Sequence, residues 1–202
     1  MPKIPNQPKS SKIIATSNRS SRAVFGFDRI TIWIDRSELP VQDILALHCT
    51  SVQMSAEQSP FQARWKLQIE LFQPTKECLT LLVEALGHDI SAKVTYVEIA
   101  CDVPASSKYQ AQAWLGEFLC SALMRSQQQT VVSVAGTWYY GRRAVDGVRC
   151  RNVLAVYADR PSKLNNAQPQ AGSTVCLHIE WRASGAAALE RIGIVSLVDL
   201  IS

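Results

Sequence analysis

Acidic residues at alternating positions of an apolar segment are the first group in this sequence that could carry chemistry. The segment 97–102 places Glu98 and Asp102 on one face of a strand, because successive side chains of a strand point to opposite faces. Their Cα atoms would lie roughly 13 Å apart, at about 3.3 Å per residue, so a neighbouring strand must contribute before one ion can be held. Glu180, an acid in the otherwise apolar segment 177–180, is the candidate.

Glu98, Asp102 and Glu180 therefore form a candidate metal site. Carboxylate oxygens of this kind suit Mg²⁺ or Mn²⁺. The alternative is that these acids are ordinary solvent-facing residues on the open side of a half-buried sheet. A site built on histidine or cysteine is not expected, because the sequence has only three histidines with no His-x-His pair, and its six cysteines lack Cys-x-x-Cys spacing.

The elements that would position these acids follow from hydrophobic periodicity. Residues 29–35 alternate with period two, as a strand with one buried face does, whereas apolar residues at helical spacing follow Pro40. A second helix begins at Pro74 and stops before Gly87, a residue typical of helix C-termini. The predicted strands are 29–35, 52–54, 65–72, 94–102, 131–134 or 137–140, 152–157 and 175–181, and the predicted helices are 40–48, 74–86, 109–124 and 185–192.

The order of these elements predicts an α+β fold made of two similar halves, 25–90 and 91–202. Ile69-Glu70-Leu71 precedes a helix in the first half, as Ile179-Glu180-Trp181 does in the second. Two such strand-helix-strand units can share one antiparallel β-sheet with helices packed on one face. We expect the halves to superimpose, preceded by a disordered basic N-terminal arm over 1–24.

Length and composition favour a single soluble domain. The chain has 202 residues, of which 47% are hydrophobic and 19% charged, enough to bury a full core. No apolar stretch reaches the roughly 20 residues that a membrane span requires, and the N-terminus lacks an apolar signal core. The expected location is the cytoplasm, with no membrane partner.

Positive charge gathers in two segments, although the net charge is only +4. The first 22 residues carry five basic residues and no acid. Such clusters would neutralise a nucleic acid backbone, with binding that weakens steeply as salt is added. The alternative is a solvated tail and loop that keep the protein soluble. The second cluster consists of Arg142, Arg143, Arg149, Arg151, Arg160 and Lys163.

An ordered set of motifs resembles one protein family. Residues 97–102 are similar to the acid-x-apolar-Ala-x-Asp strand of Rep-trans rolling-circle replication initiators, found in plasmids and phages. Residues 137–143 resemble that family's strand ending in an aromatic-Gly-x-Arg turn, and 153–160 resemble the strand that bears its active tyrosine. His178-Ile179-Glu180 falls where the family has Arg-x-Glu. With two earlier strands, the resemblance covers roughly residues 25 to 190.

The resemblance implies a metal-dependent DNA nickase and strand transferase. Tyr157 would attack a phosphodiester at a replication origin and form a 5′-phosphotyrosine bond, with Mg²⁺ or Mn²⁺ held by Glu98, Asp102 and Glu180. Arg160 would lower the pKa of the phenol or bind phosphate. The other DNA-binding residues would be Arg142, Arg143, Arg149, Arg151, Lys163 and Tyr140.

The expected partners are origin DNA, single-stranded or cruciform, a host helicase or polymerase, and a second copy of the chain in a homodimer. Three positions depart from the family's pattern, because Ala155, Asp159 and His178 stand where it has Arg, Lys and Arg. The alternative is therefore a catalytically inactive DNA-binding or inhibitory protein on the same fold.

Overall fold

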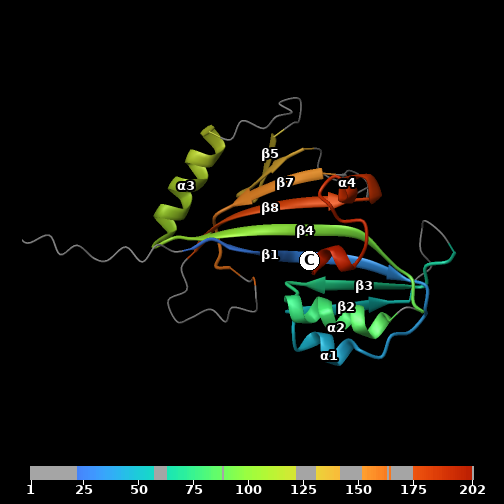
Figure 1. The fold of residues 1–202 in the computed structure, drawn as a ribbon. Helices are drawn as coiled ribbons and strands as arrows, with labels where there is room; N and C mark the ends of the chain where they lie inside the picture. The colour runs from blue at the N-terminus through green and yellow to red at the C-terminus, as the bar shows by residue number, and fades with distance from the viewer. Residues whose placement is uncertain are drawn as a thin grey trace, which may run out of the picture.

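One antiparallel sheet runs through the whole fold. The computed structural model describes residues 22–56, 63–87, 89–121, 131–141, 152–162, 164 and 175–201. Eight strands in these residues pair in the order β2-β3-β1-β4-β8-β7-β6-β5 (Figure 1). Their bounds are β1 Val24–Ile34, β2 Ser51–Ser55, β3 Leu67–Phe72, β4 Ala92–Pro104, β5 Val131–Val134, β6 Thr137–Tyr140, β7 Asn152–Tyr157 and β8 Cys176–Ser184.

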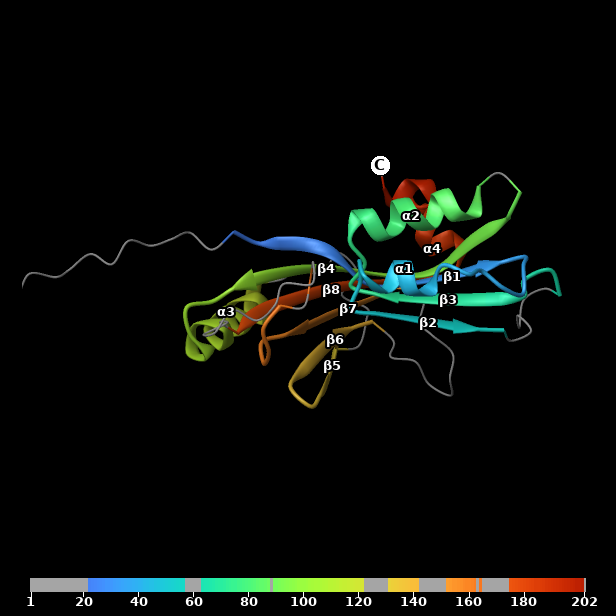
Figure 2. The same cartoon turned by 90° about the horizontal axis from the view of Figure 1, so that it is seen from below.

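A few helices pack on this sheet, so the fold is α+β. The helices are α1 Gln42–Ala46, α2 Lys76–Leu86, α3 Lys108–Ser121, α4 Ala186–Glu190 and the 3₁₀ helix η2 Val198–Leu200. Helices α2 and α4 lie on the same side of the sheet, as Figure 2 shows. None of the helices in the described part of the chain is long and apolar enough to cross a lipid bilayer.

Two apolar clusters hold the helices against the sheet. The larger joins Ile30, Ile32 and Ile34 of β1 to buried residues of α1, α2 and α4. The smaller packs Ala111 and Leu115 of α3 against β6, β7 and β8. Trp181 of β8 contacts both clusters, so one continuous face of the sheet carries the apolar core.

Local sequence signals explain where the elements begin and end. The side chain of Thr75 accepts a hydrogen bond from the backbone N–H of Cys78, which caps the N-terminus of α2. Gly87 ends α2 with a φ of 55°, in the left-handed region that favours glycine.

The predicted strands and helices are all present, with ends shifted by a few residues. Both alternatives, 131–134 and 137–140, are strands, and they pair with each other as β5 and β6. The strand predicted over 29–35 begins earlier, at Val24, because β1 continues alongside β4 as far as Asp102. The basic arm over 1–24 lies outside the described residues except for its last three.

The central pair of strands is long and bent. β1 and β4 pair over most of their length, but the register shifts between Phe27 and Arg29 and again after Thr31. Such β-bulges re-aim the side chain of the extra residue. Asp28 is the extra residue of the first bulge, because Phe27 is opposite Ile99 and Arg29 is opposite Glu98.

Candidate active site on the open face of the sheet

Tyr157 and the predicted acids lie on the sheet face opposite the apolar core. Alternation along β4, β8 and β7 places them in rows across the three strands. Glu180 is opposite both Ala100 and Ala155, and the next row joins Asp102, His178 and Tyr157. The register thus places Tyr157 of β7 on the same face as acids of β4 and β8, and these side chains are buried.

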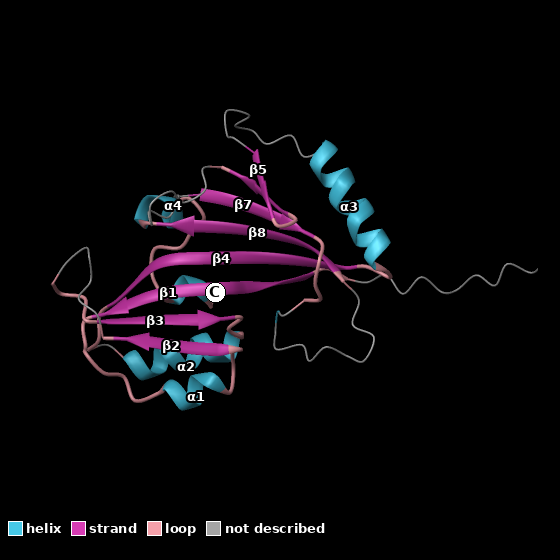
Figure 3. Cartoon of the chain, turned by 180° about the vertical axis from the view of Figure 1, so that it is seen from behind, coloured by secondary structure: helices cyan, strands magenta, loops and turns pink. Residues whose placement is uncertain are grey.

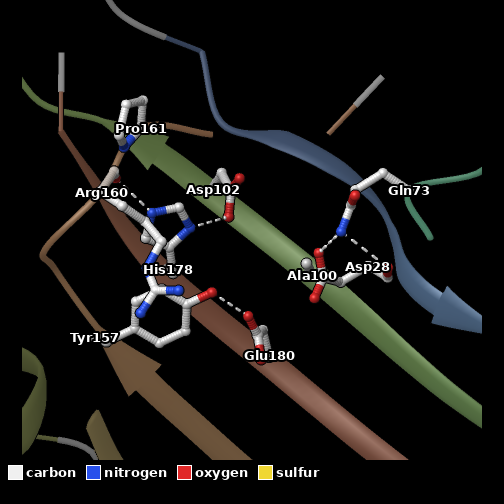
Figure 4. A pocket seen from close by; sticks show the side chains of 9 residues that line it. All are labelled: Asp28, Gln73, Ala100, Asp102, Tyr157, Arg160, Pro161, His178 and Glu180. Atoms are coloured by element: carbon white, nitrogen blue, oxygen red, sulfur yellow. Dashed lines mark hydrogen bonds and ion pairs between the residues drawn. The ribbon is translucent and has the colours of Figure 1, made fainter. Parts of the chain in front are cut away.

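A small pocket of about 70 Å³ opens among these side chains. Figure 4 shows that strands β1, β4, β7 and β8 and the segments after β3 and β7 all contribute to it. The pocket is lined by Asp28, Gln73, Ala100, Asp102, Tyr157, Arg160, Pro161, His178 and Glu180.

Three carboxylates converge beside this pocket, and the set differs from the one expected. Oxygens of Asp28, Glu98 and Glu180 all lie within 4.8 Å of one another. Glu98 and Glu180 meet as the sequence predicted, but Asp28 completes the group in place of Asp102. The bulge in β1 turns Asp28 toward these acids, and a non-local bulge cannot be read from spacing along one strand.

Asp102 is instead paired with a histidine. Its Oδ1 lies 2.7 Å from Nδ1 of His178, and Nε2 of the same ring lies 2.7 Å from the backbone oxygen of Arg160. A carbonyl oxygen only accepts hydrogen bonds, so Nε2 must carry a proton, and an ionised Asp102 requires one on Nδ1 as well. His178 therefore fits this site as the positively charged imidazolium.

The electrostatics of His178 agree with this protonation. Burial by itself lowers the pKa of His178. The hydrogen bonds with Asp102 and the Arg160 carbonyl, together with the charges of Asp102 and Glu180, outweigh burial and raise the pKa above its ordinary value. The hydrogen-bond geometry and the direction of the pKa shift both favour the protonated form of the His178 ring, which lies between Asp102 and Tyr157.

Tyr157 contacts both a cation and an acid. Its hydroxyl donates a hydrogen bond to Oε1 of Glu180. Its ring stacks on the ring of His178, with centroids 4.5 Å apart and planes 18° apart. The guanidinium carbon of Arg160 lies 4.6 Å from the centre of the tyrosine ring, so two positive groups flank the phenol.

The pKa of the Tyr157 phenol is nevertheless raised in this arrangement. Burial is the largest cause, followed by the charge of Glu180 and the hydrogen bond to it, and Arg160 opposes the shift only weakly. A nucleophilic phenolate would be favoured if positive charge offset that of the Glu180 carboxylate. The chemistry of the tyrosine therefore depends on what the acids bind.

Arg182 is the cation nearest to the three acids in the described part of the chain. Its Nη2 lies 2.6 Å from Oε2 of Glu180, and its Nε lies 3.6 Å from Oε1 of Glu98. Glu98 also accepts a hydrogen bond from the Tyr96 hydroxyl. Burial raises the pKa of Glu98, while Arg182 and this hydrogen bond act in the opposite direction.

The cluster can accommodate a divalent ion. Among the described residues, three carboxylates face one guanidinium, so these four side chains formally carry two unbalanced negative charges. Hard oxygen donors from three strands are the ligands that Mg²⁺ and Mn²⁺ prefer. The residues present therefore fit the metal that the sequence predicted.

The basic residues expected to bind DNA are for the most part outside the described residues. Arg160 is described, and its guanidinium pairs with Asp159 at 2.8 Å, a hydrogen bond that is the largest cause of its raised pKa. Its side chain remains 47% exposed and reaches the pocket rim. The residues that lie outside the described part are Arg142, Arg143, Arg149, Arg151 and Lys163.

Tyr140 does not present its ring on the open face. It packs with Leu154 and the α3 residues in the smaller apolar cluster, on the core side of the sheet. Alternation along β6 turns the neighbouring Tyr139 to the open face instead, where the guanidinium carbon of Arg182 lies 5.7 Å from its ring centre. The aromatic-aromatic sequence of β6 did not reveal which ring faces the core.

Sequence reasoning did not include Asp28, Gln73 or His178 among the candidate site residues. Asp28 had a usable signal, since an acid beside a strand-forming segment is unusual, but the bulge that directs it was not foreseeable. Gln73 follows β3 directly and carries no acidic or nucleophilic group. Only the pairing of β1 with β3 brings it to Asp28.

Comparison with known proteins adds no further assignment. No protein-family model matches the chain, and no curated protein sequence matches it either.

Proposed function

We propose that this protein nicks and rejoins one strand of DNA with Tyr157 as the nucleophile, in the manner of a Rep-trans rolling-circle replication initiator. The observation that carries the proposal is the hydrogen bond from the Tyr157 hydroxyl to Glu180, which belongs to a cluster of three converging carboxylates. A tyrosine and a group of acids in one pocket are the parts that metal-assisted phosphodiester transfer needs.

The covalent step is a transesterification. The Tyr157 oxygen attacks the phosphorus while Glu180 accepts the phenol proton, and the bond from phosphorus to the 3′ oxygen breaks as that proton passes on to the leaving oxygen. The products are a 5′-phosphotyrosine and a free 3′-hydroxyl, so no oxidant or co-reactant is consumed. The reverse attack by a 3′-hydroxyl rejoins the strand and restores the phenol.

Asp28, Glu98 and Glu180 are the residues that would hold Mg²⁺ or Mn²⁺. When bound, the ion would polarise the scissile phosphate and stabilise the charge that develops on its oxygens. His178 and Arg160 keep positive charge beside the tyrosine ring, which favours its anionic form. Asp102 orients His178 rather than serving as a ligand in this assignment.

The substrate we propose is origin DNA presented as an unpaired strand. Arg160 and Tyr139 on the open face suit a phosphate and a base, because cations and aromatic rings together bind single strands without reading sequence. The basic clusters at 142–163 and in the arm would add phosphate contacts and salt dependence. A host polymerase or helicase would then use the free 3′ end.

The sheet order supports the proposal that the domain consists of two similar halves. Reading outward from the central pair, β1, β3 and β2 on one side match β4, β8 and β7 on the other. In the first half, α1 follows β1 and α2 follows β3. In the second half, α3 follows β4 and α4 follows β8, so the helices occupy matching places in the chain order. Superposition of 25–90 on 91–202 in an experimental structure tests this relationship.

The test of function is formation of a covalent adduct. Supercoiled DNA carrying the protein's own origin is incubated with the protein and Mn²⁺, and protein bound to DNA is resolved on a denaturing gel. We expect an adduct with the wild type and none with Tyr157→Phe, which keeps the ring but cannot attack. Tyr109→Phe, at an exposed tyrosine of α3 that does not line the pocket, is the matched control and should retain the adduct.

A second candidate is a DNA-binding protein that has lost nicking. Two observations favour this candidate. The raised pKa of Tyr157 opposes formation of phenolate. The ion pair of Arg160 with Asp159 leaves the guanidinium less available to the phenol or to a phosphate. Origin binding by wild type and Tyr157→Phe alike, without adduct in either, would support this candidate and overturn the nickase.

A further inference from the structure

Gln73 adopts a backbone conformation that glutamine rarely adopts. Its φ is +44°, in the left-handed region where a Cβ atom is disfavoured and glycine or asparagine is usual. Gln73 lies directly after β3 and is only 6% exposed. Side chains held in such conformations cluster at functional sites, where surrounding contacts must hold them.

Those contacts all converge on one residue. The backbone N–H of Gln73 donates to the backbone oxygen of Asp28 at 2.9 Å. The Gln73 side-chain amide donates to the same oxygen at 3.1 Å and also to Oδ1 of Asp28. Figure 4 shows this amide directed at Asp28, on the side of the pocket away from Tyr157.

Asp28 needs such a partner because it is a bulge residue. No residue of β4 stands opposite it, so the ladder does not fix its backbone as it fixes Phe27 and Arg29. Gln73 binds both the backbone oxygen and the carboxylate, which sets the rotation of the carboxyl group. An oxygen of that group lies within 4.8 Å of ligand oxygens of Glu98 and Glu180.

The chemistry of the amide matters as much as its position. An arginine or lysine in this place would neutralise Asp28 and compete with a bound cation, as Arg182 does for Glu180. A glutamine donates a hydrogen bond without adding charge, so it fixes the carboxylate and leaves its negative charge available. Partners of this type orient metal ligands in other proteins.

We infer that Gln73 is a positioning residue that presents Asp28 to a divalent cation at the three-carboxylate site. The inference rests on the metal site of the proposed function. It assigns the left-handed backbone of Gln73 to that task, because in this conformation both its N–H and its side-chain amide bind Asp28.

The experiment measures Mn²⁺ affinity in the full chain by calorimetry, together with the melting temperature of the metal-free protein. Gln73→Gly keeps the turn, because glycine adopts positive φ freely, and removes the side chain together with its amide. We expect its affinity for Mn²⁺ to fall about 10- to 100-fold, as for other residues that orient metal ligands, while its melting temperature is not lowered. Gln68→Ala, which removes an amide bonded to Glu70, is the matched control and should bind Mn²⁺ normally.

The outcomes separate the inference from the proposed function. If the wild type binds Mn²⁺ and Gln73→Gly binds it equally well, the inference alone is overturned. If the wild type binds no Mn²⁺ at millimolar concentration, the metal site fails and the inference with it. Gln73→Asn, which tolerates the same backbone but has a shorter amide, should also bind weakly; loss of folding in both variants would show a purely structural role and overturn the inference.

Discussion

Glu70 in the first half and Glu180 in the second occupy matching places in similar segments, yet their surroundings differ. Glu70 accepts hydrogen bonds from Arg29 at 2.8 and 2.9 Å, from Thr31 and from Gln68, so one arginine and two neutral donors satisfy it. The position of Gln68 corresponds to that of His178, and Phe72 corresponds to Arg182. Figure 3 shows β3 and β8 separated by the central strands β1 and β4.

The difference lies in the balance of charge. Around Glu70 the acid and the arginine pair one to one, and Phe72 stacks against the guanidinium of Arg29 at 5.1 Å. Around Glu180 one arginine serves two glutamates, and Asp28 adds a third carboxylate. Within the part of the chain that the structure describes, the acid of this motif is balanced by one arginine in the first half, whereas three acids share one arginine in the second.

The largest expected effect is on metal binding. Replacing Glu180 with Gln should reduce Mn²⁺ affinity by more than the roughly 100-fold that loss of an orienting residue costs, because a ligand charge is removed. Glu70→Gln should leave affinity unchanged. Calorimetric titration measures the Mn²⁺ affinity of both variants. Equal losses of affinity would contradict the assignment of Glu180, but not Glu70, to the metal site.

Stability should respond in the opposite order. Glu70→Gln leaves the partly buried Arg29 without its anionic partner, and we expect a loss of about 2 kcal/mol in the free energy of unfolding. Glu180→Gln removes a charge from a repelling group and leaves Arg182 beside Glu98, so a smaller loss is expected in metal-free protein. Urea denaturation without metal measures both, and a greater loss for Glu180→Gln would contradict the comparison.

The pH dependence of stability should come from the second half. The pKa of His178 is raised by folding, so its contribution is fully present below the unfolded pKa of about 6.5 and is lost as pH rises through the higher folded value. We expect the free energy of unfolding to fall across that window in the wild type. His178→Gln, which imitates Gln68 of the first half, should flatten the fall; an unchanged pH profile would argue against a charged His178.

The smallest expected effect concerns Thr31. Its hydroxyl donates to Glu70 at 3.2 Å, and Thr31→Val removes this bond while keeping the shape of the side chain. A loss of about 1 kcal/mol in the free energy of unfolding is expected, with no change in Mn²⁺ affinity. Urea denaturation measures the free energy of unfolding, and calorimetric titration of the same sample measures Mn²⁺ affinity. A change in affinity would show that Thr31 in the first half influences the metal site.

The sequence by itself determined the elements and the face on which chemistry lies. Period two in 29–35 and 94–102 and helical spacing in 74–86 depend on residues a few positions apart, so they could be read locally. The same alternation predicted that Glu98 and Asp102 share a face, and Glu180 was predicted to join from another strand because it is an acid in an otherwise apolar segment. The elements and their polar faces could be predicted because burial of the apolar side chains on one face of each strand leaves the polar side chains on the other.

Only the tertiary structure decided that Asp28, rather than Asp102, joins Glu98 and Glu180. The bulge at Asp28, the pairing of Asp102 with His178 and the turn of Gln73 each depend on strands that are far apart in the chain. Alternation reveals the face of a side chain but not the strand beside it, because register is set by long-range pairing and packing. The composition of the site is therefore a property of the assembled sheet rather than of any one segment.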